Sequence, residues 1–107
     1  MKQFIFSLVI FSSVLTATAQ SAEELHETAR TFMRQGDYAN AILVLNRAAK
    51  LDAKNIEIQK DLGLNYYFSK DYAKAIEVYK PLLDRPDADD QCFQVAGDIY
   101  LATENAK

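Results

Sequence analysis

The chain has 107 residues, which is enough for one small domain with a core of its own. Its formal net charge is −3, and its Lys and Arg residues form no cluster. The sequence therefore lacks the positive surface that binds a phosphate backbone, and a nucleic-acid partner is not expected.

The first nineteen residues have the pattern of a secretory signal. Lys2 supplies a positive start, residues 4–15 are almost wholly apolar, and residues 17–19 form the small-x-small site of a signal peptidase. An uncleaved anchor is the alternative, but the apolar run is shorter than the roughly 20 residues that span a bilayer. We expect residues 1–19 to be removed, leaving an exported domain, periplasmic or in the cell envelope, without a membrane span.

Two helices are expected directly after the signal. Ser21, with Glu24 three residues later, forms a capping box that starts the first helix. Gly36 can take the left-handed conformation past its end, and Asp37 is a good N-cap for the second helix, which runs to about residue 51. The expected inner positions of these two helices are Leu25, Ala29, Phe32, Tyr38, Ala41, Ile42, Leu45 and Ala48.

Three further helices follow. Asn55 can cap the third, and the fourth starts at about residue 72 and loosens near Pro81, because proline removes a backbone donor. Residues 85–89 form a polar loop, and the fifth helix begins at Asp90. The expected inner positions are Leu62, Gly63, Tyr66 and Tyr67, then Ala75, Ile76, Tyr79 and Leu82, then Phe93, Ala96, Gly97 and Tyr100.

A single repeat period organises the whole chain. Residues 37–44 read Asp-Tyr-Ala-x-Ala-Ile-x-Val, and residues 71–78 repeat that pattern. Ala29, Gly63 and Gly97 fall in one column of this register. Glycine inside a helix costs about 1 kcal/mol relative to alanine, so this column predicts that two helix backbones approach closely there.

This register and these residue types resemble the tetratricopeptide repeat. The resemblance divides the chain into repeat 1 at residues 22–55, repeat 2 at residues 56–89 and a partial repeat 3 at residues 90–107. It implies an all-α fold, a right-handed α-α superhelix or solenoid of about two and a half helix-turn-helix repeats. It also implies a concave groove, lined by the first helix of each repeat, that holds a peptide or a partner helix.

The register projects eleven side chains into that groove. They run from a basic end through an apolar and aromatic middle to a polar far end: His26, Arg30, Met33, Arg34, Lys60, Leu64, Tyr67, Phe68, Gln94, Asp98 and Leu101. An exposed phenylalanine at position 68 indicates a contact site. Alternatively, Tyr67 and Phe68 pack on the neighbouring first helix near Met33. Arg30 can receive a partner's carboxylate, or the two arginines can form a solvated face with Glu27.

Catalysis has little support in this sequence. The lone histidine, His26, has no Cys or second His within helical reach, and residues 87–90 lack the glycine and glutamate of a calcium-binding loop. No cofactor, metal site or enzyme activity is expected. The lone cysteine, Cys92, is interpreted as a buried apolar residue, with pairing between chains as the alternative.

We therefore expect an exported scaffold that binds a protein or peptide in its groove. One alternative is an N-terminal segment of a larger exported protein that serves in assembly or dimerisation, with self-association through the C-terminal helix. A more remote alternative is an enzyme-associated or small-ligand-binding domain.

Overall fold

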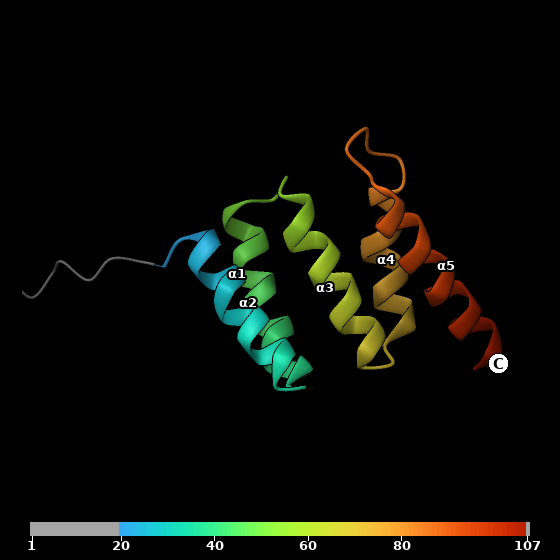
Figure 1. The fold of residues 1–107 in the computed structure, drawn as a ribbon, viewed down its shortest axis with the longest axis horizontal. Coiled ribbons are helices and arrows are strands. Elements are labelled where there is room, and N and C mark those ends of the chain that lie inside the picture. Colours follow the sequence, from blue (N-terminus) through green and yellow to red (C-terminus); the bar gives the residue numbers. More distant parts are fainter. Residues whose placement is uncertain (1–19, 107) are drawn as a thin grey trace, which may run out of the picture.

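The structure, a computed structural model, describes residues 20–106 as five helices and no strand (Figure 1). The helices are α1 (Ala22–Arg34), α2 (Tyr38–Leu51), α3 (Ile56–Phe68), α4 (Tyr72–Leu82) and α5 (Asp90–Asn105). The expected all-α fold and the order of its helices are therefore confirmed.

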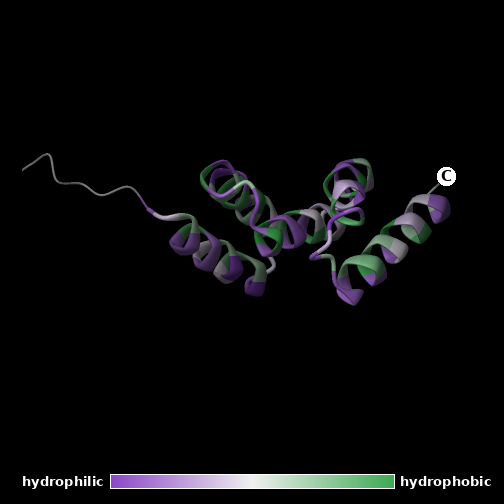
Figure 2. Ribbon diagram, turned by 90° about the horizontal axis from the view of Figure 1, so that it is seen from above, coloured by the Kyte–Doolittle hydropathy of each residue, from purple (hydrophilic) through white to green (hydrophobic). Residues whose placement is uncertain are grey.

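Each helix packs against the next one along the chain, and α3 also contacts α5. Seen from above, α2 and α4 lie along one side, α1 and α5 along the other, and α3 between them (Figure 2). One buried cluster joins α1, α2 and α3, and a second joins α4 and α5, with Tyr66 packed against both. The fold is an all-α helical-repeat solenoid whose core is divided between neighbouring helices.

Polar side chains start the helices as expected. Asp37 and Asn55 accept hydrogen bonds from backbone N–H groups of the helices that follow them. The Ser21 hydroxyl accepts from the Glu24 N–H at 3.1 Å and donates to the Glu24 carboxylate at 3.3 Å. The expected capping residues are thus confirmed, but only the serine half of the capping box forms, because the Glu24 carboxylate accepts from the serine hydroxyl instead of the Ser21 N–H.

The two inner turns of the repeats share one backbone conformation. Gly36 has a φ of 73°, and Lys70, which stands at the same place in the next repeat, has a φ of 65°. This left-handed region suits glycine because a Cβ atom is strained there. The structure keeps the turn geometry in the second repeat although a lysine has replaced the glycine.

Packing explains why a glycine stands inside α3 at position 63, as its place within a helix predicts. The ring of Tyr79 lies against it so closely that a Cβ atom on residue 63 would overlap ring carbons. The Tyr79 hydroxyl also donates to the Lys60 carbonyl oxygen at 2.9 Å. The glycine therefore accommodates an aromatic ring of α4 rather than the close approach of a second backbone.

Helix α4 ends early, as its proline predicts. The last helical residue is Leu82, directly after Pro81, whereas α2 continues to Leu51. Beyond Leu82 the N–H groups of Asp84 and Arg85 donate three residues back, at 3.4 and 3.1 Å. These tighter turns replace a regular last turn.

The expected inner face of α5 is wrong in part. The residues buried against α4 are Cys92, Ala96 and Ile99. Phe93 is 53% exposed, Tyr100 is 44% exposed, and a Cβ atom on Gly97 would meet no atom of residues 20–106 within 4 Å. The expected stripe is the face that meets a following helix in repeats 1 and 2, and the described residues contain no helix after α5.

The predicted secretory signal, residues 1–19, lies outside the described residues. Within residues 20–106, no helix combines the length and the apolar character needed to cross a bilayer.

Candidate partner-binding groove

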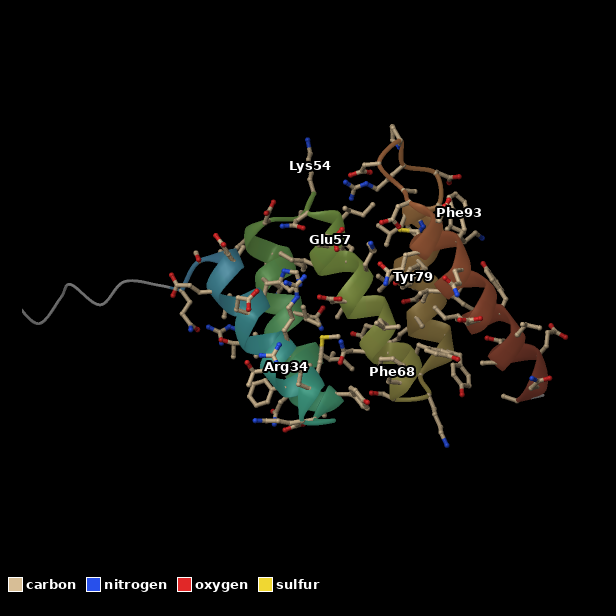
Figure 3. All side chains as sticks on the ribbon, in the orientation of Figure 1. Arg34, Lys54, Glu57, Phe68, Tyr79 and Phe93 are labelled. Atoms are coloured by element: carbon tan, nitrogen blue, oxygen red, sulfur yellow. The ribbon has the colours of Figure 1, made fainter. Side chains whose placement is uncertain are left out.

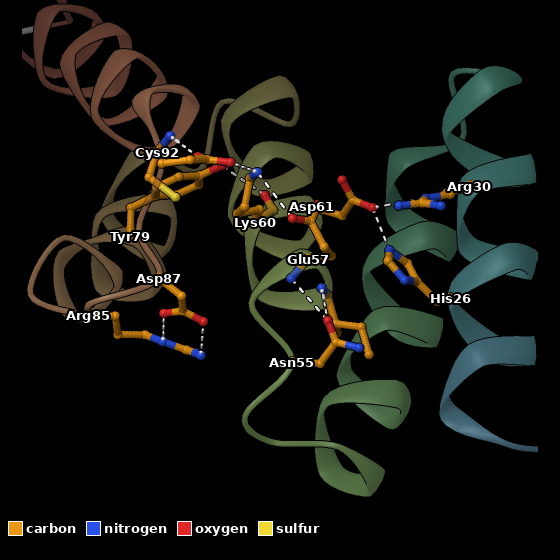
Figure 4. A network of polar contacts seen from close by, with 12 residues as sticks. His26, Arg30, Asn55, Glu57, Lys60, Asp61, Tyr79, Arg85, Asp87 and Cys92 are labelled. Atoms are coloured by element: carbon orange, nitrogen blue, oxygen red, sulfur yellow. Dashed lines mark hydrogen bonds and ion pairs between the residues drawn. The ribbon is translucent and has the colours of Figure 1, made fainter.

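His26 and Lys60 occupy the same place in successive repeats, and both are buried. His26 Nε2 lies 2.6 Å from Asp61 Oδ2, a contact that joins α1 to α3 (Figure 4). Because a carboxylate only accepts hydrogen bonds, this ring nitrogen carries the proton. The structure thus uses His26 to hold the two repeats together, which leaves little of its side chain for a partner.

Lys60 makes the corresponding connection from α3 to the start of α5. Its Nζ lies 2.8 Å from Asp89 Oδ2 and 3.4 Å from Glu57 Oε1. Burial lowers the pKa of Lys60, but the hydrogen bond to Asp89 and the Glu57 charge outweigh it, so the pKa lies above its ordinary value. The hydrogen bond from Lys60, together with the Cys92 N–H, lowers the pKa of Asp89 to about 2. Lys60 therefore also makes its main contacts within the chain, where it joins α3 to the N-cap of α5.

The two arginines predicted at the basic end already have partners within the chain. Arg30 Nη1 lies 3.2 Å from Glu27 Oε1, and Arg30 Nε lies 3.4 Å from Asp61 Oδ2. Arg34 donates to the Thr31 hydroxyl at 3.1 Å. For Arg30 the ion pair with Glu27 is the alternative that the structure supports.

A polar hollow of about 380 Å³ opens beside these residues, between α1, the loop before α3 and the start of α3. Its lining contains more carboxylates than cationic groups: Glu23, His26, Glu27, Arg30, Asp52, Asn55 and Glu57. The hollow at the expected basic end of the groove therefore also contains acidic side chains, from α1 as well as from the α2–α3 loop and α3.

The aromatic middle of the groove is partly exposed. Phe68 lies at the end of α3 (Figure 3). It is 44% exposed, whereas Leu64 and Tyr67 are partly buried. The Phe68 ring centroid lies 5.2 Å from that of Tyr38 and 5.7 Å from that of Tyr67, and Tyr67 in turn lies 5.9 Å from Tyr72. Four rings thus form a row across the ends of α3, α2 and α4.

Met33 is partly buried against the first core cluster, and the ring contacts of Phe68 are with Tyr38 and Tyr67. Phe68 therefore packs on the first turn of α2 and still presents nearly half of its surface to solvent.

The far end of the predicted groove lies on α5. Gln94 and Asp98 are exposed, and Leu101 is 64% exposed. This end is polar except for Leu101. No contact in the structure tests the role of these residues in binding, so they stay predictions.

Sequence reasoning missed the acidic partners of the groove. Asp61 of repeat 2 holds His26 of repeat 1, and Asp89, the last residue of repeat 2 and the N-cap of α5, holds Lys60. The repeat register contained the signal, because Asp61 directly follows Lys60, the counterpart of His26 in repeat 2. In both pairs a nitrogen-bearing side chain of a first helix meets a carboxylate that follows it in the sequence by about one repeat period.

The Tyr79 hydroxyl of α4 and the Cys92 thiol of α5 belong to buried residues. Burial raises the pKa of the Cys92 thiol and that of the Tyr79 hydroxyl. Cys92 is fully buried, as its interpretation as an apolar residue predicts. Among residues 20–106, no three His, Cys, Asp or Glu side chains come together as a metal site would require.

Comparison with known proteins agrees with this architecture. A family model described as the tetratricopeptide repeat matches residues 32–104. The chain belongs to the tetratricopeptide-repeat family. The family consists of repeat scaffolds that bind other proteins, so protein partners are expected of this chain and a catalytic role gains no support from the match.

Three curated relatives carry the name BBSome complex member BBS4. The chain is 36% identical to the Mus musculus protein over 95 residues, or 89% of this chain and 18% of the relative. It is 35% identical to the Xenopus tropicalis protein over 71 residues, or 66% of this chain and 14% of the relative. It is 38% identical to the Bos taurus protein over 69 residues, or 64% and 13%. The chain therefore spans less than a fifth of the length of these relatives.

Proposed function

We propose that this tetratricopeptide-repeat domain is exported and binds a peptide or a partner helix along the face of α1, α3 and α5. The observation that carries the proposal is the exposed half of Phe68, beside Leu64 and Tyr67. An aromatic side chain that is preorganised by neighbouring rings and still exposed supplies contact area at low entropic cost. The partner places an apolar residue against Phe68.

Charge favours a partner that places a basic residue in the polar hollow beside Arg30. The hollow beside Arg30 is lined by Glu23, Glu27, Asp52 and Glu57, and the guanidinium of Arg30 is already paired. An acidic segment would meet this surplus of negative charge, whereas a Lys or Arg side chain would be attracted. The remaining members of the proposed contact surface are Arg34, Gln94, Asp98 and Leu101, and His26 and Lys60 support it from within.

The name of the relatives, which describes them as members of a complex, agrees with a role in assembly. The alternative, that this segment serves to join copies of itself through α5, is less well supported. Helix α5 carries three acidic residues and no basic one, so two such helices would repel each other.

Capture of partners from the native envelope fraction tests the groove. The protein, its Phe68→Glu variant and its Leu43→Glu variant serve as bait, and the captured proteins are identified by mass spectrometry. Leu43 is 64% exposed on α2, so it gives a matched change of an apolar residue outside the groove. Partners that bind the protein and Leu43→Glu but not Phe68→Glu support the proposal. Equal capture by all three would contradict it.

Export has a separate test. The full chain with a C-terminal tag is expressed in a bacterial host, the envelope and cytoplasm are separated, and the product is sequenced from its N-terminus. A product in the envelope that begins at Gln20 supports cleavage of residues 1–19. A cytoplasmic product that begins at Met1 would contradict export and leave the groove proposal standing.

A further inference from the structure

Four aromatic rings lie in a row where α3 ends and α2 and α4 begin. Neighbouring ring centroids are 5.2, 5.7 and 5.9 Å apart along the row, which runs through Tyr38, Phe68, Tyr67 and Tyr72. The planes of neighbouring rings are inclined to each other by 38 to 46°. The row therefore offers a ridged aromatic surface rather than a flat one.

The tyrosine hydroxyls of this row have no partner in the described part of the chain. The Tyr79 hydroxyl, outside the row, donates to a backbone carbonyl oxygen of α3. The hydroxyls of Tyr38, Tyr67 and Tyr72, by contrast, make no hydrogen bond to any of residues 20–106. Because these three tyrosines are partly buried, their rings are held in place while their hydroxyl donors remain unused.

Both features match a peptide in the polyproline II conformation. Such a peptide rises about 3.1 Å per residue, so the spacing of the rings corresponds to about two of its residues. It makes no internal hydrogen bonds, so its carbonyl oxygens can accept from tyrosine hydroxyls while its proline rings pack on aromatic side chains. An α-helix already bonds most of its carbonyl groups internally and would leave the three hydroxyls without acceptors. The row therefore favours an extended, proline-rich peptide over a partner helix.

We infer that Tyr38, Phe68, Tyr67 and Tyr72 bind a proline-rich segment of another polypeptide in the polyproline II conformation. The inference rests on the proposed contact at Phe68 and names the class of its partner. A second copy of this sequence does not supply the segment, because its two prolines, at positions 81 and 86, are not adjacent and the first lies within α4.

The probe that tests the inference is nonaproline, end-blocked and fluorescently labelled, titrated with the protein and followed by anisotropy. We expect saturable binding with a dissociation constant below about 1 mM. Phe68→Glu places a charge within the row and should weaken binding about tenfold or more. Circular dichroism establishes that each variant keeps its helices.

A change that preserves the ring tests the hydroxyl contact separately. Tyr67→Phe removes one donor from the row, and we expect binding about three- to tenfold weaker. Tyr66→Phe is the matched control, because the Tyr66 hydroxyl already accepts a hydrogen bond from Asn46 at 3.4 Å and its ring lies outside the row. We expect Tyr66→Phe to bind nonaproline as the unchanged protein does.

A second labelled probe, an end-blocked helical peptide of about 15 alanine, leucine and lysine residues, represents the other kind of partner. Binding of this peptide without binding of nonaproline would assign the row to a partner helix and overturn the inference. So would nonaproline that fails to saturate up to about 1 mM, or that binds the protein, Phe68→Glu and Tyr67→Phe equally. In each of these cases the proposed function stands if capture from the envelope fraction still depends on Phe68, and it fails as well if that capture does not.

Discussion

Tyr79 of α4 covers Gly63 of α3 so closely that even a methyl group on residue 63 would overlap the ring. The same atom would also lie 3.3 Å from Val78 Cγ1. Because Tyr79 is buried and its hydroxyl is bound to the Lys60 carbonyl, the ring has little freedom to move away. The contact between α3 and α4 thus depends on the absence of a side chain.

Gly63→Ala and Gly97→Ala should therefore change stability in opposite directions. Overpacking against Tyr79 should lower the free energy of unfolding of Gly63→Ala by roughly 1 to 3 kcal/mol. Gly97→Ala should raise it by up to about 1 kcal/mol, because alanine is the better helix former and its methyl group meets no atom within 4 Å in the described part of the chain. Urea unfolding of both variants measures the difference, and equal effects would contradict the packing described.

Tyr79→Leu should partly rescue Gly63→Ala, since the equivalent residues of repeat 1, Ala29 and Leu45, are both buried in one cluster. The double variant should be more stable than the sum of the single changes by about 1 kcal/mol or more. A double-mutant cycle in urea measures this coupling. Simple additivity would mean that the ring and the glycine do not act as a pair.

Lys70→Gly should stabilise the protein. Lys70 has a φ of 65°, where a residue other than glycine costs roughly 1 to 2 kcal/mol of folding free energy. Glycine removes this cost, but its greater freedom in the unfolded chain offsets part of the gain. We expect a net gain of about 0.5 to 1 kcal/mol. Gly36→Ala, at the equivalent turn, is the matched control and should lose about 1 kcal/mol. A melting temperature that falls for Lys70→Gly would be inconsistent with this turn.

Asn65→Leu should also stabilise the protein. Asn65 is fully buried, its Nδ2 donates to the Asp61 carbonyl, and its Oδ1 has no hydrogen-bond partner among residues 20–106. The equivalent residue of repeat 3 is the buried Ile99. Removing an unsatisfied buried acceptor should gain about 1 kcal/mol, whereas the reverse change, Ile99→Asn, should cost more than that. Both are measured by denaturant unfolding. A destabilised Asn65→Leu would mean that Oδ1 is paired in solution.

Acid should weaken the connection between α3 and α5. The pKa of Asp89 is lowered from 3.8 to about 2 in the folded protein, chiefly by the hydrogen bond from Lys60. A depressed carboxyl pKa gives stability that is complete above pH 3.8 and is lost as the pH falls towards 2. The melting temperature of Asp89→Asn should therefore approach that of the unchanged protein over this interval.

Asparagine is also a good N-cap, so Asp89→Asn tests the ion pair with Lys60 rather than the capping of α5. Asp90→Asn removes a charge of the same sign from the next residue and serves as the control. If both variants have the same pH profile, the Lys60 contact does not explain the acid sensitivity.

The five helices, their caps and the repeat register are predictable from the order of the residues alone. Local signals are sufficient, because an N-cap such as Asn55 acts within its own first turn and the repeat period is visible without knowledge of contacts. The packing role of Gly63 is predictable too, since a glycine inside a helix is costly unless something occupies the space. The chain's membership of the tetratricopeptide-repeat family rests on the same pattern.

Packing between the helices determines which faces are covered and which charges meet. Periodicity predicts Phe93 and Tyr100 as inner residues of α5, but a helix in a repeat array has two apolar faces, and only neighbours determine which one is buried. The register directs His26, Lys60 and Arg30 towards a partner, whereas acidic side chains from later in the chain or from the same helix already hold them. Most of this pairing joins residues about one period apart, so it exists only once the helices have stacked.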